Sequence, residues 1–308
     1  MIWAWIGFSF FLIIMLAIDG HVVNRSKYSA HRSMRHALLW TLVWVAMALL
    51  FNFIFWRYLL ATTSAKFANE QALNFLTGYI IEKSLSIDNL FVFYMVFHQL
   101  RIPLAYQQRV FSYGIWSAVV LRLLLILMGS WLVAHFHWAL SVMGVFLFAT
   151  GIKTLLVHED ERDLSLSKFS HWTKKFFRAT HEFHGKRFFI KKNKLLYVTP
   201  LFIALIFIEF SDIVFALDSI PAIFAITTDP FIVWTSNIFA ILGLRALYFL
   251  LAGMIKRFDV LKYAIALILI FVGLKMLIMP WVAISVGVSL CIIASILLLF
   301  TVYAYVKY

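Results

Sequence analysis

The chain has 308 residues, of which 64% are hydrophobic and 13% are charged, and its formal net charge is +13. A soluble domain is nearer half apolar and a quarter charged, so this composition indicates an integral membrane protein. The one cysteine, Cys291, cannot form a disulfide within the chain, which excludes a disulfide-stapled secreted scaffold.

Nine apolar segments approach the length of about 20 residues that a spanning helix needs. In chain order they are 2–23, 37–59, 72–97, 109–134, 137–157, 199–226, 231–253, 262–279 and 281–304. No basic residue precedes the first segment and no small-residue cleavage site follows it, so we expect a retained anchor and not a signal peptide. The sequence therefore predicts an all-α polytopic membrane protein with one transmembrane domain over residues 1–308.

Basic residues gather in alternate loops between these segments. Loops 24–36, 98–109, 158–198 and 254–262 carry most of them, whereas Lys66 is the base expected on the opposite side. Basic loops stay in the cytoplasm, so we expect the N-terminus outside and the C-terminus inside. The positive charge is then a determinant of topology, and we expect the lipid bilayer, and no nucleic acid, as a partner.

The first segment ends in two polar residues, Asp19 and His21, near the predicted cytoplasmic face. They are either ordinary interface residues or ligands at the entry of a cation path.

The middle of the chain contains an internal repeat. Segment 72–97 carries an acidic residue, a second acidic residue six positions later, and then an asparagine. Segment 199–226 repeats this order, with a serine in place of the asparagine. Each is followed by a segment with a lone arginine and then by one that ends in Gly-x-Lys. The matched residues are Glu82, Asp88, Asn89, Arg122, Gly151 and Lys153 in the first unit, and Asp212, Asp218, Ser219, Arg245, Gly273 and Lys275 in the second.

The two repeat units, at about 72–157 and 199–279, have opposite orientations in the predicted topology. Helices 3–5 and 6–8 therefore form an inverted repeat, which is typical of secondary transporters with a site near the bilayer midplane. Pro200 is expected to start the sixth helix. Pro221 removes a backbone donor, so we expect this helix to be broken or kinked near Asp218–Ser219.

The charged residues within these segments are the candidate functional residues. Each charge at the centre of a membrane helix costs on the order of 3 kcal/mol, so such residues are expected to face one another or a wet cavity. The candidate cation ligands are Glu82, Asp88, Asn89, Glu209, Asp212, Asp218 and Ser219, and the candidate counter-ions or gating residues are Lys83, Arg122, Lys153, Arg245 and Lys275. The alternative is a purely structural role, in which these residues form ion pairs that hold helices together. Carboxylate, amide and hydroxyl oxygens suit Mn²⁺, Mg²⁺ or Ca²⁺.

Two stretches of the chain carry a resemblance to a known family. The residues from Glu82 to Phe93, EKSLSIDNLFVF, and from Phe207 to Thr227, FIEFSDIVFALDSIPAIFAIT, resemble the two signatures of the TerC family, which is named for tellurium resistance. Lys194 departs from the pattern, which has glycine after the asparagine. The resemblance implies a bacterial inner-membrane protein that exports manganese, and the family is also associated with tellurite resistance and redox modulation.

The leading hypothesis is a divalent cation transporter that exports Mn²⁺ by alternating access, with proton exchange as a coupling that buried carboxylates would allow. One alternative is an oxyanion (tellurite) transporter whose substrate binds the five bases named above. Another is a membrane partner that helps to metallate other proteins. No phosphate loop or prosthetic-group motif is found, so we expect neither an enzyme nor a bound cofactor. The sequence specifies neither the coupling ion nor the oligomeric state.

Overall fold

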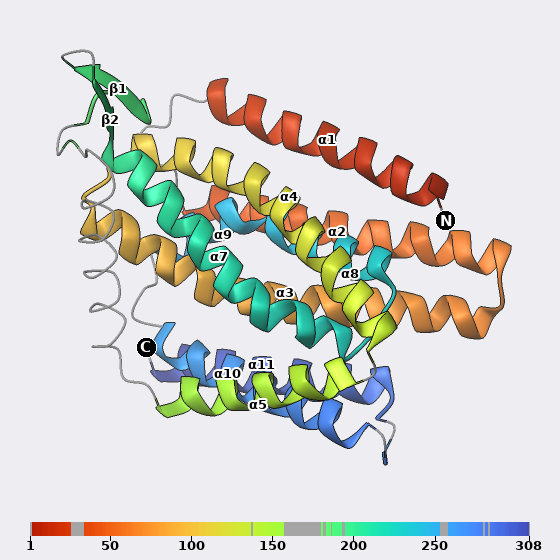
Figure 1. Ribbon diagram of the computed structural model, residues 1–308. Coiled ribbons are helices and arrows are strands. Elements are labelled where there is room, and N and C mark those ends of the chain that lie inside the picture. Colours follow the sequence, from red (N-terminus) through yellow and green to blue (C-terminus); the bar gives the residue numbers. More distant parts are fainter. Residues whose placement is uncertain are drawn as a thin grey trace. The chain divides into compact units, whose positions relative to one another are not determined.

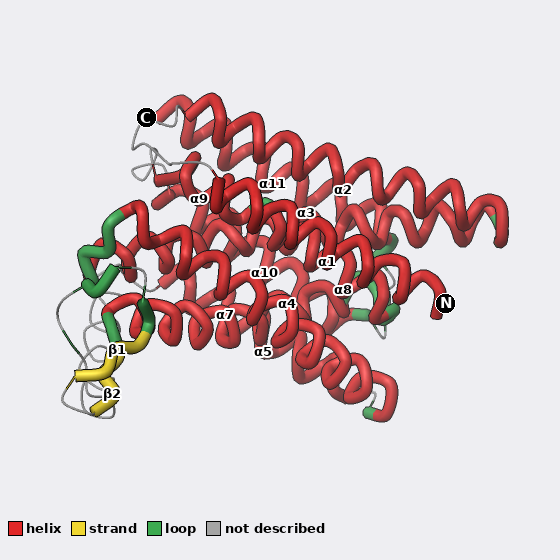
Figure 2. The backbone as a smooth tube through the Cα atoms, turned by 90° about the horizontal axis from the view of Figure 1, so that it is seen from above, coloured by secondary structure: helices red, strands yellow, loops and turns green. Residues whose placement is uncertain are grey.

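The structure is a computed structural model that describes residues 2–25, 34–136, 138–156, 180, 183–185, 187–192, 195–252, 258–279, 281–282 and 284–307. Its helices are α1 (Ile2–Arg25), α2 (Met34–Thr62), α3 (Ala65–Gln99), α4 (Leu104–His135), α5 (Trp138–Leu156), α7 (Pro200–Phe224), α8 (Pro230–Leu242), α9 (Leu244–Ala252), α10 (Phe258–Ile278) and α11 (Val286–Lys307). A hairpin of β1 (Phe189–Lys192) and β2 (Leu195–Val198) precedes α7. Figure 2 shows these strands in yellow and the helices in red.

Each predicted apolar segment overlaps one or more helices, although 281–304 begins before α11, and the chain is an all-α polytopic membrane protein. Among the described residues, six stretches are long and apolar enough to cross a membrane: Ala37–Thr62, Tyr106–His135, Trp138–Leu156, Pro200–Phe224, Pro230–Phe249 and Val286–Ala304. The helix α3, which carries Glu82, Lys83 and Asp88 near its middle, is not among them. The count of nine spans and the inverted repeat stay predictions.

The chain divides into two compact units. The first comprises the described residues of Met1–Arg32, Asn89–Val120 and Val157–Val214, and the second those of Ser33–Asp88, Leu121–Leu156 and Phe215–Tyr308. Helices α3, α4 and α7 contribute residues to both units.

The first unit is packed by aromatic rings. Phe93 and Phe97 at the end of α3 lie 5.5 and 5.4 Å, between ring centroids, from Phe111 of α4. Phe189 of β1 lies 4.4 Å from Phe202 in the first turns of α7. The antiparallel register pairs Phe189 with Val198, which places the hairpin directly before the start of α7.

The hairpin is absent from the sequence prediction, which treats 158–198 as one loop. Its signal is present in retrospect, since two runs rich in apolar residues are separated by two residues that begin with asparagine. The helix start at Pro200 is confirmed.

The second unit has an apolar core to which five helices contribute. Ile81 and Leu85 of α3 lie in one cluster with Leu147 of α5, Ala222 of α7 and Ile268 of α10. Ile293 of α11 belongs to the same cluster. Figure 1 shows α5, α10 and α11 side by side, and contacts join α10 to both of the others.

Glycines bring the backbones of α5 and α10 together. A Cβ atom on Gly273 would lie 2.6 Å from the backbone nitrogen of Phe148, and one on Gly151 would lie 2.9 Å from the carbonyl oxygen of Ala266. Small residues at helix contacts allow such close approach in membrane proteins. The Gly-x-Lys ends that mark the sequence repeat thus supply a packing contact.

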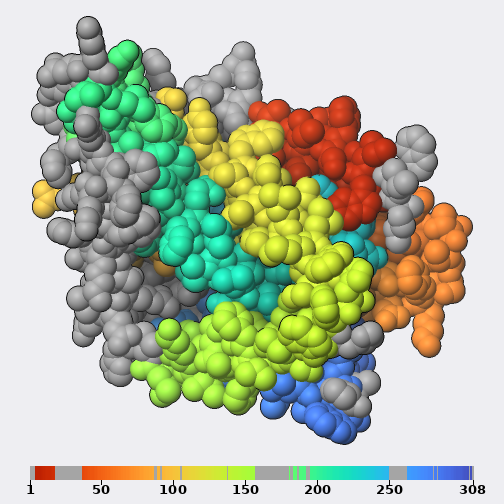
Figure 3. Space-filling view, in the orientation of Figure 1, coloured from red at the N-terminus to blue at the C-terminus, as the bar shows by residue number. Residues whose placement is uncertain are grey.

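Large apolar side chains cover the outside of several helices. In the space-filling view of Figure 3, α5 presents a strip of lime-green atoms to the viewer. Trp138, Val142, Val145 and Phe146 are the large apolar residues of this helix that are most exposed in its first half. An exposed apolar face of this kind suits contact with lipid.

Candidate functional site

The second unit contains a buried ion pair. Glu82 of α3 is 1% exposed and Arg122 of α4 is 0% exposed. The Nη1 group of Arg122 donates a hydrogen bond to Oε1 of Glu82. Because both helices are largely apolar, the two charges neutralise each other where an isolated charge would be costly.

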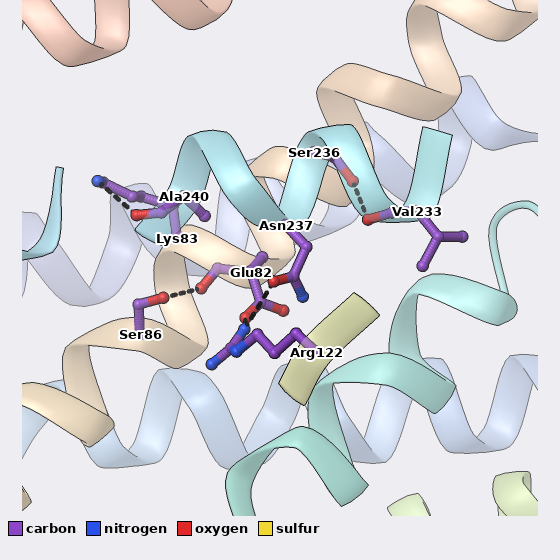
Figure 4. A network of polar contacts seen from close by, with 8 residues as sticks. All are labelled: Glu82, Lys83, Ser86, Arg122, Val233, Ser236, Asn237 and Ala240. Atoms are coloured by element: carbon purple, nitrogen blue, oxygen red, sulfur yellow. Dashed lines mark hydrogen bonds and ion pairs between the residues drawn. The ribbon is translucent and has the colours of Figure 1, made fainter. Parts of the chain in front are cut away.

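A third buried side chain completes this cluster. Nη1 of Arg122 also donates to Oδ1 of Asn237 on α8, with 3.0 Å between the two atoms. Figure 4 shows the guanidinium against both the Glu82 carboxylate and the Asn237 amide. Sequence reasoning missed Asn237, although the signal was an amide within the apolar stretch Pro230–Leu242.

Two polar atoms of the cluster lack a hydrogen-bond partner among the described residues. Among the described residues, the second carboxylate oxygen of Glu82, Oε2, and the amide nitrogen of Asn237, Nδ2, are buried and have no hydrogen-bond partner. A buried polar atom without a partner is costly and therefore calls for a ligand or a proton. The open oxygen of Glu82 is a hard donor of the kind that Mn²⁺ accepts.

The helix α8 that carries Asn237 is buried along its whole length from Phe231 to Leu242. Its first turn is capped by Asp229, whose Oδ1 accepts a hydrogen bond from the backbone nitrogen of Phe231 at 2.9 Å. Pro230 occupies the first helical turn, where a missing N–H group does no harm. These features fix the start of α8.

Lys83 stands beside Glu82 in the sequence but points elsewhere. Its Nζ donates to the carbonyl oxygen of Ala240 at 3.1 Å, in the last turn of α8 (Figure 4). A cation at a helix C-terminus satisfies free carbonyl groups and opposes the negative end of the helix dipole. The described contact of Lys83 is therefore a helix cap.

The segment predicted as one helix over 231–253 is two helices, α8 and α9, which meet at Gly243. A Cβ atom on Gly243 would lie 2.6 Å from Nζ of Lys83 and 3.3 Å from Cβ of Trp44. The interruption occurs at the residue with a poor helix propensity, where the lysine approaches the backbone. Arg245, one of the predicted counter-ions, is buried just beyond it.

The other predicted residues of the second unit lie on three helices. Asp218 is half-buried and Ser219 is buried on α7, and Lys275 is buried in the last turn of α10. Lys153 is exposed near the end of α5. A break at Asp218–Ser219 is wrong, because α7 continues through both residues and past Pro221 to Phe224, whereas the alternative of a kink there stays a prediction.

The first unit holds a second group of polar residues. Ser117 of α4 donates from its hydroxyl to Oε1 of Glu209 on α7 at 2.5 Å. Glu209 also lies against the backbone of α4, since a Cβ atom added at Gly114 would be 3.5 Å from the same oxygen, an ordinary van der Waals contact. Asp212 is buried one turn after Glu209, and Asn89 is buried on α3.

Several predicted residues lie outside the described part of the chain. The side chains of Asp19, His21 and Asp88 are among them, as are residues 157–179 of the basic loop. Among the described residues, no three His, Cys, Asp or Glu side chains come close enough to hold a metal ion together. The shared set of acidic ligands therefore stays a prediction.

The chain as a whole matches known proteins. The model described as "Integral membrane protein TerC family" matches residues 67–307. An Escherichia coli K12 protein named "Putative membrane-bound redox modulator Alx" is 50% identical over 306 residues, which cover 99% of this chain and 95% of the relative. A membrane protein of Myxococcus xanthus is 46% identical over 293 residues (95% and 89% of the two chains), and one of Buchnera aphidicola is 39% identical over 302 residues (97% and 96%). No solved structure matches the chain.

Proposed function

This chain belongs to the TerC family of integral membrane proteins, and from that premise we propose that it exports a divalent metal cation, Mn²⁺, from the cytoplasm by alternating access. The observation that carries the proposal is the buried carboxylate of Glu82. One of its oxygens is neutralised by Arg122, and the other has no partner among the described residues. An ionisable group that is buried among the apolar helices of a membrane protein is a functional candidate by default.

The pair suggests how an empty site stays stable. With no cation bound, Arg122 neutralises Glu82, so the carboxylate does not stand as an uncompensated charge in an apolar surrounding. An arriving Mn²⁺ takes over this neutralisation through the open oxygen and repels the guanidinium. Cation binding thereby exchanges one counter-charge of Glu82 for another.

The described contacts of the bases favour a cation over an oxyanion. Arg122 is engaged by Glu82 and Asn237, and Lys83 is engaged by a carbonyl group at the end of α8. Lys153 lies exposed near the end of α5. An oxyanion substrate would instead need several bases turned toward a common space.

The test is transport by the purified protein in liposomes. We expect Mn²⁺ flux in preference to Mg²⁺ and Ca²⁺, a dependence of its rate on the imposed pH gradient, and loss of flux in Glu82→Gln. We expect the same loss in Asp212→Asn, because an acid in the second repeat unit would serve the same path. Lys66→Gln, on the opposite side from the basic loops, is the matched control and should retain flux.

Two outcomes would overturn the proposal. Absence of Mn²⁺ flux from folded wild-type protein would point to a partner role in metallating other proteins. Tellurite flux that Mn²⁺ does not inhibit would point to an oxyanion carrier.

A further inference from the structure

We propose that Asn237 is a positioning residue that tunes cation affinity by holding the Arg122 guanidinium when the cation occupies Glu82. The proposal rests on the proposed function and concerns a residue that the two sequence signatures do not contain. It assigns a task to the one amide of α8 that meets the buried ion pair.

The geometry places two acceptors at one nitrogen atom. Nη1 of Arg122 donates to Oε1 of Glu82 and to Oδ1 of Asn237, and both acceptor residues are buried. A donor shared in this way can pass from one acceptor to the other by a small movement of the side chain. The guanidinium then keeps a hydrogen bond at every stage, which avoids the penalty of a buried charge without a partner.

The chemistry of the amide matters as much as its position. A neutral oxygen accepts from a guanidinium but holds it less strongly than a carboxylate does. In the empty site Arg122 donates to both residues and Glu82 is the stronger acceptor, so Asn237 becomes its remaining acceptor when the cation neutralises Glu82. A carboxylate at position 237 would keep the arginine permanently, and an apolar side chain would give it no second acceptor there.

Asn237 itself carries a cost that a purely packing role does not explain. Its Nδ2 group is buried without a hydrogen-bond partner among the described residues. A buried donor without an acceptor destabilises the fold, so an apolar residue of similar size would pack α8 at least as well. The hydrogen bond that the amide oxygen accepts from Arg122 gives a reason for an asparagine at this position.

The experiment compares Asn237→Leu with Asn237→Asp by Mn²⁺ flux and Mn²⁺ binding on the full-length protein. We expect N237L to raise the half-saturating Mn²⁺ concentration about tenfold, since the displaced guanidinium loses a hydrogen bond between charged and neutral groups. We expect N237D to lower it about tenfold and to slow maximal flux, because the introduced carboxylate would retain Arg122 and the cation would be released slowly.

Thr235→Val is the matched control. Thr235 is buried on the same helix, and its hydroxyl donates to the carbonyl groups of Phe231 and Ile232 within α8. Its isosteric loss should leave the half-saturating concentration within about twofold of wild type, because that bond does not touch the ion pair.

The outcomes separate the two proposals. Opposite shifts in N237L and N237D support the role of Asn237. Suppose that wild type carries Mn²⁺ and that both variants keep the half-saturating concentration of wild type, with or without a loss of maximal flux. Asn237 is then a structural residue, and this inference fails while the proposed function stands. If wild type carries no Mn²⁺, both fail. Binding of Mn²⁺ to N237D in detergent gives a readout even where N237L does not fold.

Discussion

At the scale of single residues, the pair of Glu82 and Arg122 decides both stability and chemistry. Two charges that are almost fully buried cost free energy that their attraction only partly returns. Removal of one partner leaves the other as a buried charge without a counter-charge, whereas removal of both leaves no buried charge. This asymmetry makes the pair measurable by a double-mutant cycle.

We predict that Glu82→Gln and Arg122→Gln each lower the free energy of unfolding by about 3–5 kcal/mol, as for other broken buried pairs. The double variant should be more stable than either single one, because no lone charge is left behind. Thermal and denaturant unfolding in detergent measure this. If the loss of unfolding free energy in the double variant equals the sum of the losses in the two single variants, the two residues are not coupled.

The same cycle separates stability from transport. A double variant that folds as well as wild type and still carries no Mn²⁺ would show that the carboxylate is needed for more than holding α3 to α4. Recovery of both stability and flux in that variant would assign the pair a structural role.

At the scale of elements, the contact between α5 and α10 depends on glycine. The atoms nearest a Cβ on Gly273 belong to the backbone of Phe148 and Gly144, which cannot rotate away as a side chain can. Any larger residue must push the two helices apart. The apolar core shared by α3, α5, α7, α10 and α11 would open with them.

We predict that Gly273→Ala lowers the free energy of unfolding by about 1–3 kcal/mol, the usual range for overpacking. Gly287→Ala on α11 is the control, since a Cβ there has nothing within 4 Å. That variant should be neutral or up to about 1 kcal/mol more stable, because alanine is the better helix former. A Gly273→Ala protein with the melting temperature of wild type would contradict the packing argument.

Local patterns determine elements well where hydropathy is continuous and less well elsewhere. The segments 37–59 and 137–157 correspond to α2 and α5 within a few residues, because a long apolar run in lipid must satisfy its backbone as a helix. The division of 231–253 has a local signal in Gly243, but the close approach of Lys83 and Trp44 at that point comes from other helices and could not be read from the sequence. The unbroken course of α7 through Pro221 likewise shows that tertiary packing tolerates a proline inside a helix.

At the scale of the whole molecule, the basic loops lead to a prediction about orientation. Nine spans place the termini on opposite sides of the membrane, whereas an even number places them on the same side. If the six stretches that are long and apolar enough among the described residues were the complete set of spans, the number of spans would be even. Orientation therefore tests whether the charged helices also span.

We predict that a fluorescent protein fused after Tyr308 is active in the cytoplasm and that alkaline phosphatase fused there is inactive. A tag before Met1 should be reached from outside intact spheroplasts, since the basic loops hold the other side in the cytoplasm. Fusion of the same reporters in the turn between α2 and α3, just before Lys66, gives the control with opposite readouts. Both termini on one side would reject the count of nine.

The sequence by itself determined that this is a polytopic membrane protein of the TerC family and which charged residues lie within its apolar segments, because hydropathy and short signatures are local properties. Only the tertiary structure decided which of those charges meet. It paired Glu82 with Arg122, added Asn237 to them, and turned Lys83 to the end of α8. Such partners lie as far as 157 positions apart, and the packing of helices, not the order of residues, brings them together.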